Sequence, residues 1–203
     1  MANENERKLV MAITGASGSI YAVRFLEAVL EYYEKIYLTL TENAAAVIKT
    51  ELGIDFPTDK VDAQSLLGGY YKKVEIFSPT DLAAPPCSGS VKHEGMVIIP
   101  CSMGTVGRIA SGVSNDLVTR AADVCLKERR PLILVIRETP LNLIHLRNLT
   151  ALAEAGATIL PAAPGFYHNP KTIEDLVSFV VCRVMRQLGI THVALPEWER
   201  ASK

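Results

Sequence analysis

The sequence predicts a doubly wound α/β fold, in which helices cover both faces of a single parallel sheet. Short apolar runs alternate with longer amphipathic stretches along the whole chain of 203 residues. The apolar runs are continuous rather than alternating, which is typical of strands buried on both faces. Hydrophobic residues make up 49% of the chain and charged residues 21%, which is enough to bury the core of one domain of ordinary size.

The elements follow from these two patterns in chain order. Short runs rich in aliphatic residues predict strands, and apolar residues three or four positions apart predict helices. In order they are strand 9–14, helix 19–34, strand 36–41, helix 43–52, strand 73–77, strand 96–100, helix 105–110, helix 115–128, strand 132–137, helix 142–154, strand 158–161 and helix 173–188. Segments 53–71 and 78–95 fit neither pattern, and loops this long are usually functional or mobile. We treat 1–203 as one domain, with a core over about 8–188 and a tail over 189–203.

Charge and cysteine content exclude several classes of protein. The chain has 21 basic and 22 acidic side chains, a formal net charge of −1, and no block of like charges, so we expect no nucleic-acid partner. Its 4 cysteines lie far apart without a Cys-x-x-Cys pair, so we expect neither a metal site nor a disulfide framework. The apolar run at 9–13 is too short for a signal peptide or a membrane span. We therefore expect a cytoplasmic protein with no membrane partner.

The residues that follow the predicted strands are mostly glycine or hydroxylated. They are Gly15-Ala16-Ser17-Gly18, Thr41, Cys101-Ser102-Met103-Gly104-Thr105, Glu138 and Gly165-Phe166-Tyr167. In doubly wound sheets ligands bind outside the carboxyl ends of the strands, and this composition suits a phosphate or a flat ring. The first turn lacks the third glycine of the dinucleotide motif and the Gly-Lys of a P-loop, so the sequence favours an anion or cofactor cradle of another kind, with a plain helix cap as the alternative.

Several polar residues can be interpreted in two ways. Arg108 follows Cys101 by seven residues, one more than the cysteine phosphatase loop requires, so Cys101 is better interpreted as a small buried residue. Arg120 and Lys127 lie seven apart on one predicted helix, which fits either a solvated basic face or a clamp for an anion. Glu138 follows the next strand, where it could move a proton or form a structural ion pair.

Taken in order, six groups of residues resemble the UbiX family of flavin prenyltransferases over nearly the whole chain. They are Thr14-Gly15-Ala16-Ser17-Gly18, Ser88-Gly89-Ser90, Pro100-Cys101-Ser102-Met103-Gly104-Thr105, the stretch from Arg120 through Lys127 to Leu132, Arg137-Glu138-Thr139-Pro140 and Pro164-Gly165-Phe166-Tyr167. Each group alone is weak evidence for the family, whereas the six groups in this order are highly specific for it.

The resemblance implies an enzyme that joins a dimethylallyl group from dimethylallyl monophosphate to N5 and C6 of reduced FMN. The product, prenylated FMN, is the cofactor of UbiD-type decarboxylases. Members of the family need no metal and assemble into dodecamers whose active sites lie between subunits. The resemblance therefore implies a homo-oligomer with FMN as the prenyl acceptor.

The resemblance also implies a role for individual residues. The expected FMN contacts are Gly15, Ala16, Ser17, Thr41, Ser90, Ser102, Met103, Thr105 and Arg120, with Arg120 on the phosphate side. Glu51 and Ser17 handle a proton at flavin N5, although the sequence alone suggests a surface helix residue at Glu51. The positions that hold and protonate the dimethylallyl phosphate are Lys127, Glu138, Tyr167 and Arg183, with Trp198 near the prenyl pocket. Cationic donors on a leaving phosphate, an acid to protonate it and an aromatic environment are what allylic ionisation needs.

Two alternative functions remain open. FMN-dependent cysteine decarboxylases share the fold but carry a Pro-x-Met-Asn motif, and here Pro140-Leu141-Asn142-Leu143 lacks the methionine. A non-catalytic FMN-binding protein would use the same glycine- and hydroxyl-rich strand ends. Such a protein would have no need of the second basic and acidic set around Lys127 and Glu138.

Overall fold

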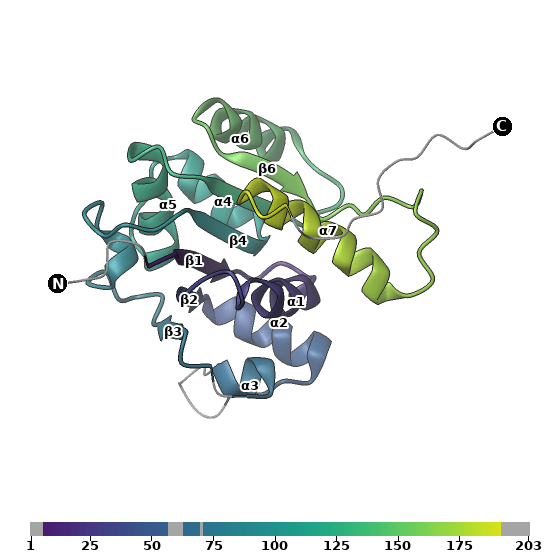
Figure 1. Cartoon of the computed structure of the whole chain (residues 1–203). Helices are drawn as coiled ribbons and strands as arrows, with labels where there is room; N and C mark the ends of the chain where they lie inside the picture. Colours follow the sequence, from purple (N-terminus) through teal and green to yellow (C-terminus); the bar gives the residue numbers. More distant parts are fainter. Residues whose placement is uncertain (1–5, 57–62, 70, 192–203) are drawn as a thin grey trace.

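The computed structural model describes residues 6–56, 63–69 and 71–191, and its centre is one six-stranded sheet (Figure 1). All neighbouring strands are parallel, in the order β3-β2-β1-β4-β5-β6. The elements are β1 (Lys8–Ile13), α1 (Ser19–Val29), β2 (Lys35–Leu40), α2 (Glu42–Leu52), α3 (Ala63–Leu67), β3 (Val74–Phe77), the 3₁₀ turn η1 (Pro85–Cys87), β4 (Met96–Cys101), α4 (Met103–Ala110), α5 (Leu117–Lys127), β5 (Leu132–Ile136), α6 (Leu143–Glu154), β6 (Thr158–Pro161) and α7 (Ile173–Gln187). The predicted doubly wound parallel sheet is confirmed.

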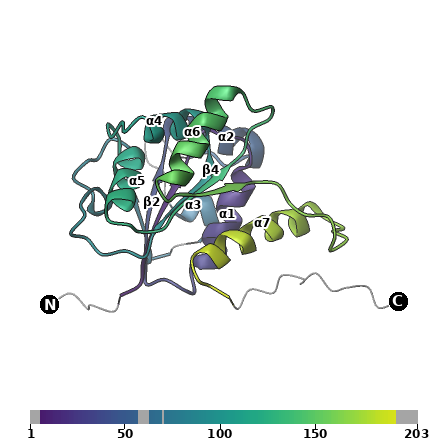
Figure 2. The same ribbon diagram turned by 90° about the horizontal axis from the view of Figure 1, so that it is seen from above.

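Helices cover both faces of the sheet, and each face has its own core. In β1, Leu9, Met11 and Ile13 enter one core together with residues of α1, α2 and α7. Val10 and Ala12 enter the other core, which is completed by α4, α5 and α6. Figure 2 shows α4, α5 and α6 on one side of the sheet and α1 and α7 on the other. Burial on both faces explains why the central strands are continuously apolar.

The predicted boundaries differ from the structure by one or two residues at most elements, and three differences have a clear physical reason. Helix α1 ends at Val29 instead of residue 34. The prediction was too long because Tyr32 and Tyr33, which follow the helix, continue its apolar spacing, and Tyr33 is only 1% exposed. Helix α4 begins at Met103, two residues earlier than predicted, since the Ser102 hydroxyl caps it. The segment 53–71, predicted as a loop, contains α3.

The order of the strands reverses direction between β1 and β4, which lie side by side at the centre of the sheet. At such a switch point the connections leave toward opposite faces and open a crevice at the carboxyl ends of the strands. The Thr14 hydroxyl joins the two ends, because it donates to the Pro100 carbonyl (2.8 Å) and accepts from the Ser102 N–H (2.8 Å). The loops after β1 and β4 are thereby held next to each other. No helix within the described ranges has the length and hydropathy to span a membrane.

Candidate active site at the carboxyl edge of the sheet

The turn after β1 is held by a carboxylate from α2. Gly18 has φ +107, a backbone conformation that favours glycine, and its N–H donates to both oxygens of Glu51 at 3.0 Å. The Ser19 N–H donates to Glu51 Oε2 at 2.7 Å, and the Ser17 hydroxyl also bonds to this carboxylate. Burial raises the pKa of Glu51, but these hydrogen bonds outweigh it and hold the pKa below its ordinary value. The predicted pair Ser17 and Glu51 is therefore brought together, with the carboxylate ionised at neutral pH.

Two helix N-termini meet at a cavity of about 630 Å³ beside the switch point. Thr41 caps α2 and Ser102 caps α4, each accepting a backbone N–H at 3.3 Å. Both line the cavity, together with Gly15 and Thr105. Gly104 also lines it, and a Cβ added there would have no atom within 4 Å, so this helix end is open to a ligand. Hydroxyls and free helix N–H groups are suitable donors for a phosphate monoester, and the volume is that of a small-molecule site.

A second polar group lies after β5 and β6. Arg137 Nε donates to the Ser17 carbonyl at 3.1 Å, which places the end of β5 against the turn after β1. Glu138 follows and is exposed. Beyond β6, Arg183 of α7 donates to the Tyr167 hydroxyl at 3.4 Å, and its guanidinium lies 5.2 Å from the centre of the Phe179 ring.

Aromatic rings pack together beside this arginine. Tyr167 meets the Phe179 ring edge to face at 5.8 Å, and His168 stacks on the same ring at 5.3 Å. A Cβ at Gly165 would lie 2.9 Å from Tyr167 and 3.1 Å from Phe179, so the rings need a glycine here. The result is a cation with a phenol beside an apolar, aromatic wall.

Lys127 and Ser90 lie at the other edge of the sheet, and Arg120, in the first turn of α5, is engaged with Cys87 and Asp123 instead of lining the cavity. Arg120 Nε donates to the Cys87 carbonyl at 3.2 Å, while Lys127 pairs with Glu128 next to Gly89. Helix α5 runs back antiparallel to β5, so Lys127 lies near the start of that strand, as does the Ser90 loop before β4. Because β5 has 5 residues and a strand rises about 3.3 Å per residue, roughly 16 Å separates this edge from the carboxyl edge. Lys127 and Ser90 cannot reach a ligand there without a second copy.

The remaining predicted residues are easily placed. Ala16 and Met103 are both buried, 6% exposed, behind the turns that they form. Trp198 lies outside the described residues. Cys101 is fully buried, and burial raises the pKa of its thiol to about 12, which confirms its interpretation as a small packing residue.

Sequence reasoning assigned no role to two arginines at this edge, Arg137 and Arg108. Arg137 directly precedes Glu138 at a strand end, which was a usable signal. Arg108 lines the cavity beside Ser102 and Thr105. Its spacing of three residues from Thr105 and six from the N-cap Ser102 puts it near the same side of α4 as these two hydroxyls, which is a signal present in the sequence.

The comparisons with known proteins agree with one another. Residues 1–185 match the family model described as Flavoprotein. The chain is 44% identical over 195 residues to the flavin prenyltransferase UbiX of Pseudomonas aeruginosa, covering 94% of this chain and 93% of the relative. It is 42% identical over 191 residues to that of Methanocaldococcus jannaschii, covering 94% and 98%.

Solved structures give the same picture. AnUbiX (PadA1) in complex with FMN and dimethylallyl pyrophosphate superposes with a TM-score of 0.81 at 38% identity, over 96% of this chain and 100% of that chain. The dodecameric FMN-dependent Ubix-like decarboxylase from Escherichia coli O157:H7 has a TM-score of 0.84 at 37% identity, over 95% and 100%. The FMN-dependent cysteine decarboxylase TvaF, at 16% identity and a TM-score of 0.61, shares the fold alone.

Proposed function

Because the chain belongs to the UbiX family of flavin prenyltransferases, we propose that it joins a dimethylallyl group, carried as a phosphate ester, to reduced FMN. One observation within the structure carries this proposal. A hydroxyl-lined cavity opens at the switch point, and a separate cation and acid set follows the next strands at the same edge. A protein that only stores FMN has no use for the second set.

The residues around the cavity fit the acceptor, FMN. Thr41, Ser102 and Thr105 offer hydroxyls, and the open N-terminus of α4 offers backbone N–H groups to its phosphate. Reduced FMN supplies the nucleophilic N5 and C6 when bound. Ser17 and the ionised Glu51 form a hydrogen-bonded pair that can accept and return a proton at N5.

The second set fits the donor. Tyr167 and Arg183 present a hydroxyl and a guanidinium to the leaving phosphate. Glu138, exposed after the end of β5, is the acid that would protonate it. The Phe179 and Tyr167 rings beside this guanidinium would stabilise positive charge on the allyl group as its C–O bond breaks.

Lys127, Arg120 and Ser90 complete the proposed site from another copy of the chain. Lys127 and Ser90 lie at the opposite edge of the sheet in one copy, so their predicted roles require a homo-oligomer. The helix α6 carries exposed Leu143 and Ile144, 59% and 67% exposed, which can pack against a neighbouring copy. We propose a dodecamer on the model of the dodecameric relative, with the product passed to a UbiD-type decarboxylase.

Mixing two inactive variants tests the shared site. Glu138→Gln removes the acid at the carboxyl edge, and Lys127→Ala removes the cation at the other edge. Each variant alone should bind FMN but convert almost none of it with dimethylallyl monophosphate. Co-refolded in equal amounts, the two should regain about a quarter of wild-type turnover per site, because random assembly pairs two intact halves in about one site of four.

The control is a co-refolded mixture of Glu138→Gln with Glu138→Gln carrying an affinity tag, which should stay inactive. Full activity in either single variant would refute the roles assigned to these side chains. Absence of any gain in mixed oligomers would show that both groups act within one copy.

A further inference from the structure

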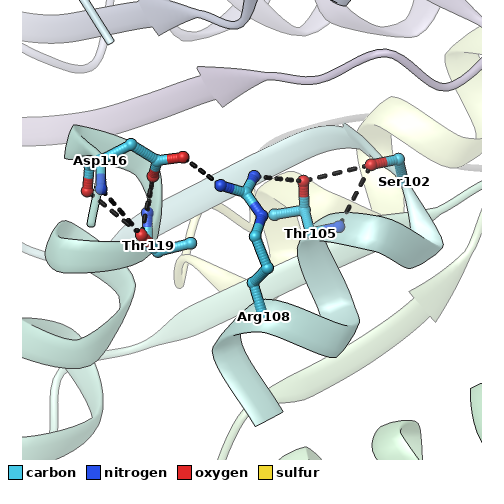
Figure 3. Close-up of polar contacts among 5 residues, drawn as sticks. All are labelled: Ser102, Thr105, Arg108, Asp116 and Thr119. Atoms are coloured by element: carbon cyan, nitrogen blue, oxygen red, sulfur yellow. Dashed lines mark hydrogen bonds and ion pairs between the residues drawn. The ribbon is translucent and has the colours of Figure 1, made fainter. Parts of the chain in front are cut away.

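Arg108 lies in the last turn of α4, three residues after Thr105 and six after the N-cap Ser102, and it lines the cavity at the N-terminal end of this helix. Its Nη2 donates to Thr105 Oγ1 at 3.4 Å, and Thr105 Oγ1 lies 3.1 Å from Ser102 Oγ. Figure 3 shows the guanidinium between Asp116 and this pair of hydroxyls. The cavity is lined by all four of these side chains.

Asp116 fixes the orientation of the guanidinium. Its Oδ2 accepts from Arg108 Nη1, and its Oδ1 accepts from the backbone N–H and the hydroxyl of Thr119, both at 2.7 Å. Asp116 is also the N-cap of α5, so it is anchored at a helix end. Burial raises the pKa of Asp116, but the bonds from Thr119 and Arg108 outweigh it and lower the pKa. The guanidinium is thus held on one side and directs its other N–H groups toward the cap of α4.

We propose that Arg108 binds the phosphate of FMN together with the Ser102 and Thr105 hydroxyls. The inference rests on the proposed function, because it takes FMN as the ligand of this cavity. A planar guanidinium beside two hydroxyls and an open helix N-terminus is a donor set for a phosphate dianion.

In this proposal Arg108 is the cation that faces the FMN phosphate within one copy of the chain. Arg120, to which the resemblance gives that place, is engaged with the Cys87 carbonyl and with Asp123 at 2.7 Å, and it does not line the cavity. Arg108 is the arginine that reaches the cavity from the described part of this chain. Arg120 is left for the proposed contact between copies.

Comparing FMN with riboflavin isolates the phosphate. The full-length protein is stripped of flavin and titrated with each compound, following the quenching of flavin fluorescence. Arg108→Gln should weaken FMN binding about 10- to 100-fold, the range for a charged hydrogen bond to phosphate, and leave riboflavin binding nearly unchanged. Arg108→Lys should recover part of the loss. Lys72→Gln, a loss of one exposed positive charge before β3, is the control and should change neither affinity.

The outcomes separate the inference from the proposed function. If wild-type protein prefers FMN to riboflavin and Arg108→Gln keeps the full preference, the inference is wrong and the prenyltransferase proposal stands. If Arg108→Gln weakens both flavins equally while its urea unfolding midpoint is unchanged, Arg108 shapes the cavity without binding phosphate, and the inference is wrong again. A wild-type protein that binds neither flavin overturns both.

Discussion

Replacing Glu51 by glutamine tests the central contact of the site in two ways, by stability and by its dependence on pH. The carboxylate accepts from the Gly18 N–H at 3.0 Å and from the Ser19 N–H at 2.7 Å, at the beginning of α1. Glutamine keeps one acceptor oxygen but loses the negative charge and presents an NH₂ to the same donors. In the variant Glu51→Gln the hydrogen bonds from Gly18 and Ser19 should therefore be weaker, because the acceptor carries no charge and one acceptor oxygen is gone.

The size of the effect follows from the type of contact. Charged hydrogen bonds contribute about 1.5–3 kcal/mol when buried, and a negative charge at a helix N-terminus about 0.3–1 kcal/mol. Glu51 is exposed in part, so solvent screening reduces these values. We expect the free energy of unfolding to fall by about 1–2 kcal/mol at pH 7, equivalent to a Tm lower by about 2 to 8 °C for a chain of this size.

Urea denaturation at several pH values provides the assay. Because the pKa of Glu51 is lowered in the folded protein, its contribution is fully present above the ordinary pKa of a carboxyl and is lost as the pH falls through the folded-state pKa. The difference in unfolding free energy between wild type and Glu51→Gln should therefore be constant near neutral pH and should shrink toward zero at acid pH. Glu31→Gln, an exposed carboxylate after α1, is the matched control and should change stability by less than about 0.5 kcal/mol.

Two results would refute this reasoning. One is an unfolding free energy for Glu51→Gln equal to that of wild type at pH 7. The other is a difference that persists undiminished at acid pH, which would mean that the substitution acts through packing and not through the charge.

Three further predictions concern single positions. Thr14→Val removes the buried hydroxyl that joins the ends of β1 and β4, and should lower the free energy of unfolding by about 1–3 kcal/mol in urea titrations; a change below 0.5 kcal/mol would contradict the role of this bridge. Gly165→Ala places a methyl group 2.9 Å from the Tyr167 ring, so it should raise the KM for the dimethylallyl donor while FMN affinity stays the same, and equal losses of both would argue against a donor-specific effect. Cys101 is fully buried with its pKa raised to about 12, so mass spectrometry should find it unmodified by iodoacetamide at pH 7.5 in the folded protein and alkylated in urea.

The sheet was predictable because its central strands are buried on both faces, which leaves the same continuous apolar pattern in each. The elements that differ lack such a signal. Tyr33 has helical spacing yet lies after the end of α1, buried in the core, and α3 follows a polar segment with no periodicity. Local spacing cannot reveal which face an apolar residue joins after the chain has turned.

The placement of Ser17 and Glu138 was predictable, because both follow the ends of central strands of the sheet. The site was not predictable from local pattern where a residue acquires its role across the fold. Glu51 is separated from Gly18 by 33 residues, and only the resemblance indicates its role. Arg108 is oriented by Asp116 across the break between two helices, a relation that the spacing along one helix does not express.

The most direct test of the account is the mass of the flavin after reaction. The protein is incubated without oxygen with FMN, dithionite and dimethylallyl monophosphate, and in parallel with the pyrophosphate, and the extracted flavin is analysed by mass spectrometry. The wild-type protein should yield a flavin heavier by one isoprene unit, and the Glu138→Gln variant should yield none. FMN that binds tightly but returns unmodified with both donors would contradict prenyl transfer.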